Sequence, residues 1–198
     1  LSKRDEAPNT ALANAIAKEH NAVAVKELIA LLQHKDKNIQ SDSIKVLYEV
    51  AALEPKLLIP YYKELATQLT SKNNRLVWGA MTALNAITAT IPNEVHSLLK
   101  EILVASEKGS VIAKDHALGI LVKLAQHEKY KSKCMQLLLD MLSNSAGNQF
   151  AMYAESIAAI VPAADKETFL AILNNRTPML EKESQQKRVQ KLVNKLSK

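Results

Sequence analysis

The chain has 198 residues, of which 47% are hydrophobic, while only 4% are aromatic and only four are glycines. This length suffices for one domain with a sizeable core. Because alanine and leucine must then supply most of the packing, the composition favours stacked helices and argues against a β-sheet.

The charge is unevenly distributed along the chain. The net charge is +6, and residues 179–198 hold +4 of it, so the preceding residues are close to neutral. No apolar run approaches the ~20 residues that a membrane span needs. The single cysteine, Cys134, excludes an internal disulfide, fits a reducing compartment and is expected to be a small buried side chain. A soluble, cytoplasmic protein is therefore predicted.

The N-terminal part is predicted to be a cap. Residues 1–9 are polar, and Thr10 can cap a short alanine-rich helix over Ala11–Glu19. This helix is expected to cover the open end of the helices that follow. We therefore assign residues 1–21 to a polar segment with a capping helix.

The next residues are predicted to form helix pairs joined by short polar turns. Apolar residues recur there at helical spacing, and Pro55 and Pro92 suit the first turn of a helix. The expected pairs are Ala22–Gln33 with Lys37–Leu53, Pro55–Leu69 with Asn74–Thr90, Pro92–Ala105 with Ser110–His127, Tyr130–Leu142 with Asn148–Val161, and an irregular fifth pair, Asp165–Leu173 with Met179–Leu196.

The second helices repeat with a constant step of about 37 residues. Residues of similar character recur at this step on one helical face, which is expected to be buried. The four sets in phase are Ser43, Ala80, Ala117 and Ala154; Val46, Ala83, Ile120 and Ile157; Leu47, Leu84, Leu121 and Ala158; and Val50, Ile87, Leu124 and Val161. The first helices keep the same step in Leu28, Leu65, Ile102 and Leu139. A helix-turn-helix unit with this period is typical of a stacked solenoid.

These features resemble the HEAT/armadillo-like family of α-helical repeats, through the paired helices, the short polar turns and a proline, Pro60, in a first helix. The resemblance implies an all-α fold, a right-handed α-solenoid of about four to five helix pairs. Residues 22–174 would form the repeats. Residues 175–198, with Val189, Leu192, Val193 and Leu196 on one side and lysines on the other, would form a basic amphipathic capping helix.

The sequence offers no support for catalysis. Its five histidines show no spacing that would hold a metal, and neighbouring residues such as Asp115 and His116 point about 100° apart on a helix. There is also no glycine-rich phosphate loop and no nucleophile motif. We therefore predict a protein that is not an enzyme and needs no cofactor or metal.

The leading hypothesis is a module that binds another protein. The family resemblance implies that second helices form the inner wall, and the residues opposite their packed faces would meet a partner peptide or helix. The predicted partner-binding residues are Lys45, Tyr48, Trp78, Thr82, Asn85, Asp115, Val122 and Met152, within a ribbon that also holds Ser41, Gly119, Ser156 and Ala159. Aromatic side chains beside small neighbours suit such an interface. Whether Trp78 and Tyr48 are exposed or belong to the core stays open.

Two other functions remain possible readings. A nucleic-acid-binding protein would use Lys45, Arg75, Lys114 and Lys123 with the C-terminal lysines. HEAT-like alkylpurine DNA glycosylases resemble the chain in architecture, although Trp78 is followed one turn later by Thr82 where an acid would be expected. The chain could also be a structural part of a longer solenoid. A monomer is expected in the leading hypothesis.

Overall fold

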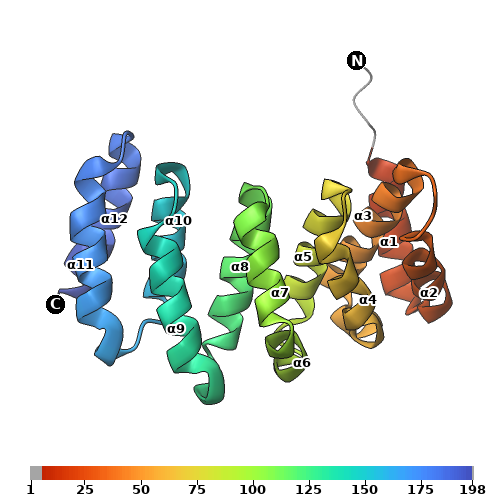
Figure 1. Ribbon diagram of the computed structural model, residues 1–198, viewed down its shortest axis with the longest axis horizontal. Coiled ribbons are helices and arrows are strands. Elements are labelled where there is room, and N and C mark those ends of the chain that lie inside the picture. The colour runs from red at the N-terminus through yellow and green to blue at the C-terminus, as the bar shows by residue number, and fades with distance from the viewer. Residues whose placement is uncertain (1–5, 198) are drawn as a thin grey trace. The chain divides into compact units, whose positions relative to one another are not determined.

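The computed structural model describes residues 6–197, and the chain forms twelve α-helices and five short 3₁₀ helices in that range, without a strand (Figure 1). It divides into two compact units, residues 1–120 and 121–198, called unit 1 and unit 2 below. Residues 1–5 of the predicted polar segment lie outside the described residues.

The helices follow the predicted order. Unit 1 contains α1 (Ala7–Glu19), α2 (Ala22–Leu31), α3 (Lys37–Leu53), α4 (Tyr62–Thr67), α5 (Asn74–Ile87), α6 (Pro92–Ser97), α7 (Leu99–Lys108) and most of α8 (Val111–Leu124). Unit 2 contains the end of α8, then α9 (Glu128–Ser143), α10 (Gly147–Ala158), α11 (Lys166–Arg176) and α12 (Glu183–Leu196). Each of these described helices is too short or too polar to cross a lipid bilayer.

Two second helices begin at corresponding caps, 37 residues apart. The Asp36 carboxylate accepts a hydrogen bond from the backbone N–H of Asn38 at 2.7 Å, and the Asn73 side chain accepts one from that of Arg75 at 3.1 Å. Each cap satisfies an N–H group that the first turn leaves free. The predicted starts of α3 and α5 are therefore confirmed.

Proline interrupts the first helix of the second pair. Short 3₁₀ segments, Pro55–Leu57 and Ile59–Tyr61, precede α4, and a third, Gln68–Thr70, follows it. Pro60 lacks the N–H group that a continuous helix would use, so the predicted unbroken helix over Pro55–Leu69 is wrong.

The helix predicted over Pro92–Ala105 is divided into α6 and α7, because the backbone of Leu98 departs from helical geometry. Two predicted helix starts are also wrong by four residues. The first helix begins at Ala7, ahead of Thr10, because Pro8 fits the first turn and the Thr10 N–H donates to the Glu6 carbonyl. The last helix begins at Glu183 instead of Met179, since Thr177–Met179 forms a 3₁₀ turn.

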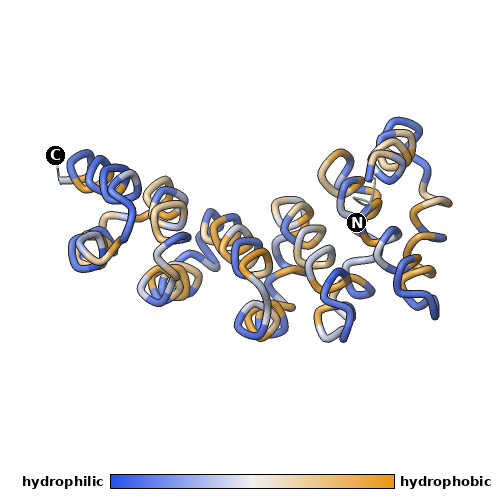
Figure 2. Tube along the Cα trace, turned by 90° about the horizontal axis from the view of Figure 1, so that it is seen from above, coloured by the Kyte–Doolittle hydropathy of each residue, from blue (hydrophilic) through white to orange (hydrophobic). Residues whose placement is uncertain are grey.

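The periodic positions form the core. In the four in-phase sets every side chain is buried except Ala158 and Val161, which are half-buried at the end of α10 and after it. Apolar and polar residues alternate around the helices in Figure 2, as expected for amphipathic helices. Ser43 is the polar member of this set, and its hydroxyl donates to the Ile39 carbonyl at 2.7 Å.

The helices of each unit pack as neighbouring pairs. In unit 1, α3 contacts α1, α2 and α5, and α1 is joined to α3 where the Asn9 amide donates to the Asp42 carboxylate at 3.1 Å. In unit 2, α10 contacts α9 and α12, while α11 contacts α9 and α12. Second helices therefore lie side by side within each unit. The face of each second helix that does not pack against its neighbours is available to a binding partner.

Candidate partner-binding site

A groove lies between α3 and α5 in unit 1 and has a volume of about 190 Å³. Below it is called the α3–α5 groove. It is lined by Glu6, Ser41, Ile44, Lys45, Tyr48, Arg75, Trp78, Gly79, Thr82 and Ile112. Four of the predicted partner-binding residues, Lys45, Tyr48, Trp78 and Thr82, are therefore brought together in one place.

Gly79 allows the two helices to approach closely beneath the groove. A Cβ atom at this position would overlap Ile44 Cγ1 and would lie 3.2 Å from Ile44 Cβ. Ile44 is buried, so it forms the floor of the groove rather than part of its rim. Trp78 directly precedes the glycine, and the close contact thus positions its ring beside the gap between the helices.

Trp78 and Tyr48 are both half-buried. Each ring has one part packed against the helices and another part that faces solvent. The question that the sequence left open therefore has an intermediate answer, since neither side chain belongs wholly to the core. Partly exposed aromatic side chains in a depression are typical anchors for a protein partner.

Lys45 is held by groups of the chain itself. Its ammonium group lies 2.6 Å from Glu49 Oε1, 3.2 Å from Glu6 Oε2 and 4.9 Å from the centre of the Tyr48 ring. Burial opposes the charge of Lys45, but the hydrogen bonds to Glu49, Tyr48 and Glu6 outweigh it and leave the pKa above its ordinary value. Lys45 is therefore a permanently charged, internally paired group.

Thr82 and Asn85 join α5 to α8. Thr82 Oγ1 lies 2.8 Å from His116 Nε2, and Asn85 Nδ2 lies 3.1 Å from His116 Nδ1. The Thr82 hydroxyl also donates to the Trp78 carbonyl at 2.8 Å. A neutral imidazole that carries its proton on Nε2 satisfies all three contacts, since it donates to Thr82 and accepts from Asn85. The polar groups of these two residues thus hold neighbouring helices together.

Gly119 completes the contact between α5 and α8. A Cβ atom there would lie 2.7 Å from Asn85 Nδ2, closer than side chains normally approach. Gly119 and Thr82 are 37 residues apart, and Gly79 and His116 are also 37 residues apart. At both of these repeat positions, one second helix therefore carries a glycine and the other a polar side chain.

Ser41 is the one further predicted residue that lines the groove among residues 6–197, while Asp115, Val122 and Met152 lie outside it. Ser41 is buried, and its hydroxyl donates to the Lys37 carbonyl at 2.6 Å, so it does not face a partner as expected. Asp115 is half-buried on the part of α8 in unit 1. Val122 is half-buried and Met152 exposed, and both belong to unit 2.

Four residues that line the groove were not predicted to meet a partner, namely Glu6, Ile44, Gly79 and Ile112, and Arg75 was assigned only to a nucleic-acid site. Arg75 and Ile112 are 37 residues apart and lie three residues before Trp78 and Asp115, so a ribbon extended by one helical turn would have included them. Glu6 carries no such signal, because it precedes the first repeat.

No group of three or more metal-binding side chains is found among residues 6–197. The lone cysteine, Cys134, is buried in α9, and burial raises the pKa of its thiol to about 11. A thiol in that state is a poor nucleophile at neutral pH. The predicted small buried side chain is therefore found.

Comparison with known proteins identifies the fold. No family model and no curated protein sequence matches this chain. Among solved structures, a designed armadillo repeat protein in complex with the peptide (KR)4 is similar over 98% of this chain and 91% of its own, with a TM-score of 0.74 and 14% identity. A computationally designed armadillo repeat protein for modular peptide recognition is similar over 96% of this chain and 91% of its own, with a TM-score of 0.72 and 16% identity. The predicted all-α solenoid of armadillo/HEAT-like helix pairs is thus confirmed.

Proposed function

We propose that the chain is a non-catalytic module that binds a peptide or helix of another protein at the α3–α5 groove. The observation that carries this proposal is the pair of half-buried aromatic rings, Tyr48 and Trp78, beside a groove whose floor is apolar. Aromatic residues supply much of the binding energy at protein interfaces, especially where neighbouring groups exclude water.

The chemistry of the groove supports binding rather than a reaction. Two of its polar side chains are engaged in structural contacts: Lys45 with Glu6 and Glu49, and Thr82 with His116. Such fixed groups are suited to shape a surface. Two similar structures are those of designed repeat proteins, one bound to a peptide and the other made for peptide recognition, and this supports the same use of the fold here.

The proposal is tested with Trp78→Ala and a random peptide library displayed on phage. Peptides selected on the wild-type chain are expected to bind the variant about thirtyfold more weakly, the effect of removing one central aromatic anchor. Fluorescence polarisation with the labelled peptides measures the affinities, and circular dichroism verifies that the variant keeps its helices. Unchanged binding by a folded variant would exclude the groove as the site.

Leu53→Ala is the matched control. Leu53 is an exposed apolar residue on α3, the helix that carries Tyr48, and it does not line the groove. The control should bind the same peptides with unchanged affinity. Val122 and Met152 in unit 2 stay predictions from the sequence, and Met152→Ala tests by itself whether Met152 contributes to peptide affinity.

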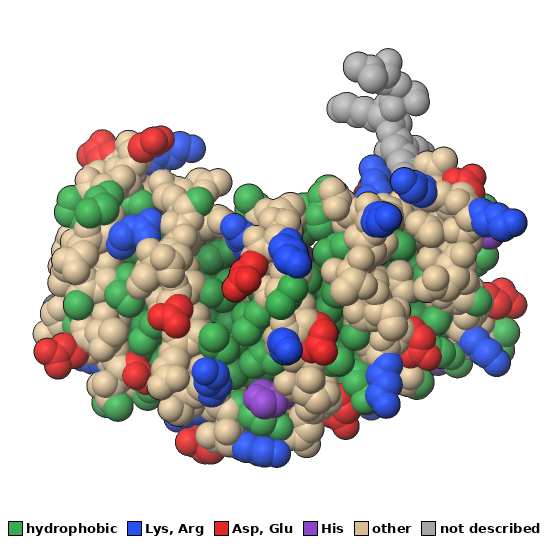
Figure 3. All heavy atoms as spheres, in the orientation of Figure 1, with side chains coloured by type: hydrophobic (Ala, Val, Ile, Leu, Met, Phe, Trp, Pro, Cys, Tyr) green, Lys and Arg blue, Asp and Glu red, His purple; other side chains and the backbone are tan. Residues whose placement is uncertain are grey.

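Nucleic-acid binding is the second candidate, and two of the cations named for it, Lys45 and Lys123, are unfavourable. Lys45 is paired with two carboxylates, and burial lowers the pKa of Lys123, which is half-buried. On the surface in Figure 3, acidic and basic side chains of the described residues are interspersed. A backbone-binding surface would instead gather positive charge along one path.

A gel shift at two salt concentrations tests this candidate directly. Nucleic-acid binding predicts a strong shift at low salt that disappears steeply as salt rises. Absence of a shift at low salt would exclude it and leave peptide binding unaffected. A cytoplasmic location and a monomeric state remain predictions from the sequence.

A further inference from the structure

The charged groups of the α3–α5 groove differ in whether the chain already neutralises them. Glu6 and Glu49 both pair with Lys45, whose ammonium group also lies over the Tyr48 ring. The carboxylates and the aromatic face that a basic ligand would use are therefore occupied from within. An incoming ammonium or guanidinium group would have to displace Lys45 and leave it unpaired in a half-buried position.

Arg75, in contrast to Lys45, is not neutralised by another group of the described residues. It is exposed at the same groove, and within residues 6–197 its guanidinium group has no hydrogen bond and no ion pair. Arg75 and Trp78 are three residues apart on α5, so their side chains are neighbours on one helical face. A guanidinium group presents donors that match the two oxygens of a carboxylate. A ligand carboxylate here would meet a cation without an internal competitor.

The remaining wall of the groove is apolar. Ile44 forms its floor, and Tyr48, Trp78 and the exposed Ile112 stand around it. A cavity of about 150 Å³ can hold a benzene-sized group, so a volume of about 190 Å³ accommodates one aromatic or branched aliphatic side chain. The hydroxyl groups of Ser41 and Thr82 already donate to backbone carbonyls and do not demand a polar ligand.

Asp115, the acidic residue on the adjoining helix, does not reverse this preference. It lies three residues after Ile112 on α8, and it already has an interaction partner within the chain. Of the charged groups that line the groove and Asp115 beside it, Arg75 is therefore the one available to pair with a ligand.

Resting on the proposed function, we propose that the groove selects an acidic peptide segment. In this segment an aromatic or aliphatic residue is flanked by Asp or Glu. Its apolar side chain lies between Tyr48, Trp78 and Ile112, and its carboxylate pairs with Arg75. This preference is opposite in sign to that of the designed armadillo protein whose bound peptide is (KR)4.

The test uses three fluorescein-labelled peptides with the full chain. All three share a central Leu in a Gly-Ser background, and they differ only in the residues on either side of it, which are Glu, Gln or Lys. The Glu peptide should bind about tenfold more tightly than the Lys peptide, because one is attracted and the other repelled by Arg75. Weaker or equal binding of the Glu peptide would overturn the proposal.

Arg75→Ala and Arg75→Glu assign the preference to one residue. Arg75→Ala should weaken the Glu peptide about fivefold and leave the Gln peptide unchanged. Arg75→Glu should make the Lys peptide the preferred ligand. Since Arg75 is exposed and its side chain forms no ion pair with the described residues 6–197, both variants should keep the helical circular dichroism spectrum. An equal loss for all three peptides would indicate a structural role and contradict the proposal.

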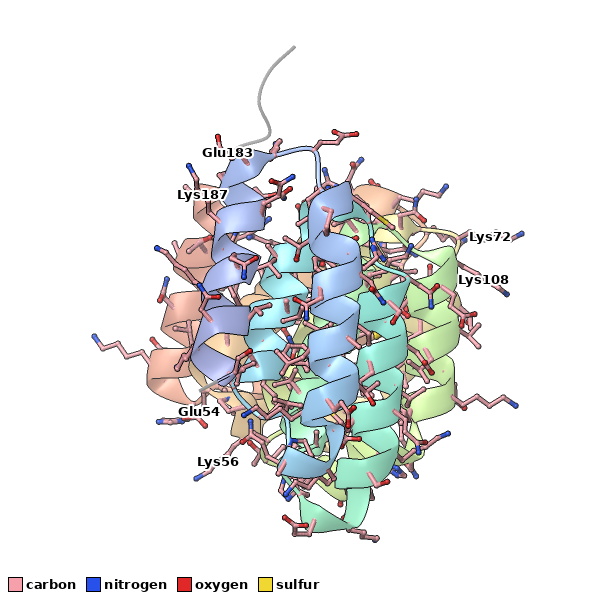
Figure 4. All side chains as sticks on the ribbon, turned by 90° about the vertical axis from the view of Figure 1, so that its left-hand side faces the viewer. Glu54, Lys56, Lys72, Lys108, Glu183 and Lys187 are labelled. Carbon is pink, nitrogen blue, oxygen red and sulfur yellow. The ribbon has the colours of Figure 1, made fainter. Side chains whose placement is uncertain are left out.

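Lys56→Ala is the matched charge control. Lys56 is exposed at the edge of unit 1, is labelled in Figure 4 and does not line the groove. It should leave all three affinities unchanged. If no peptide binds the wild-type chain and display selects none, the proposed function itself fails. If peptides bind but show no preference for acidic residues, the proposed function stands and the charge selectivity is wrong.

Discussion

Second helices of neighbouring pairs contact one another in both units, but with different chemistry. The helices are α3 and α5 in unit 1, and α10 and α12 in unit 2. In unit 1, a glycine lets the helices approach, and a groove remains above it. In unit 2, an exposed Arg188 side chain on α12 donates to both carboxylate oxygens of Glu155 on α10. The repeat thus reproduces helix packing while the surface chemistry varies from pair to pair.

Arginine side chains also replace helix caps in unit 2. The Arg176 guanidinium group at the end of α11 donates to the carbonyl of Ser143, the last residue of α9, and to that of Ser145 just beyond it. It also lies 5.0 Å from the centre of the Phe150 ring. Unit 2 therefore uses its arginines for structure, whereas Arg75 in unit 1 is left for a ligand.

The largest expected effect is that of Arg176→Ala. The variant loses two charge-assisted hydrogen bonds to helix-ending carbonyls, which should lower the free energy of unfolding by about 2–3 kcal/mol. Urea denaturation measures the loss. Arg176→Lys keeps the charge without the fork and should recover only part of it. A stable Arg176→Ala variant would mean that the carbonyls are equally well served by water.

Gly79→Ala should have the next largest effect. The new methyl group overlaps Ile44, which is buried, so the helices must separate, and overpacking of this kind costs about 1–3 kcal/mol. The gain in helix propensity of up to about 1 kcal/mol offsets part of this cost. Gly147→Ala is the same substitution with ordinary van der Waals space, 3.8 Å from Leu180 Cδ2, and should not destabilise. Equal stability of the two variants in urea would contradict the close contact.

His116→Phe should have a smaller effect, because it conserves a ring but removes the hydrogen bonds of His116 to Thr82 and Asn85. We expect a loss of about 1 kcal/mol in the free energy of unfolding. A double-mutant cycle with Asn85→Ala isolates the coupling between the two side chains. Additive losses would show that the contact contributes nothing to stability.

Arg188→Ala should have the smallest effect, about 0.5 kcal/mol at pH 7, because the pair is exposed and screened by solvent. Its hydrogen bonds to Arg188 hold the pKa of Glu155 below the ordinary value. A depressed carboxyl pKa stabilises the fold above the unfolded pKa of about 4.3, and the contribution is lost as pH falls through the folded pKa. The stability difference between wild type and variant should therefore vanish in acid. A difference that persists at low pH would rule out the ion pair as its source.

Much of the fold could be predicted because apolar residues recur along the chain at helical spacing and with a constant repeat length. Ala80, Ala83 and Leu84 are buried as their helical spacing requires, and the same holds one step earlier and one step later. Helix ends were less predictable, since Thr10 and Met179 carry plausible signals that Pro8 and the Thr177–Met179 turn override. Local propensities compete at such positions, and tertiary contacts decide among them.

The candidate site was predictable only in part. Spacing alone places Tyr48, Trp78 and Thr82 on the free faces of second helices, and those three do line the groove. Spacing says nothing about pairing across helices, so Ser41 was expected to face a partner although it is buried. Glu6 was missed because its contact to Lys45 spans separate helical segments.

The sequence by itself determined the succession of helix pairs and the residues that each pair buries. The reason is that the helical rotation of about 100° per residue places periodic apolar residues on one face of each helix. The tertiary structure alone decided which surface groups neutralise one another. Among residues 6–197, Lys45 pairs with two carboxylates and Arg75 with none, although both are cations on second helices. Charge pairing depends on distances between side chains far apart in sequence, and these distances exist only once the helices have packed.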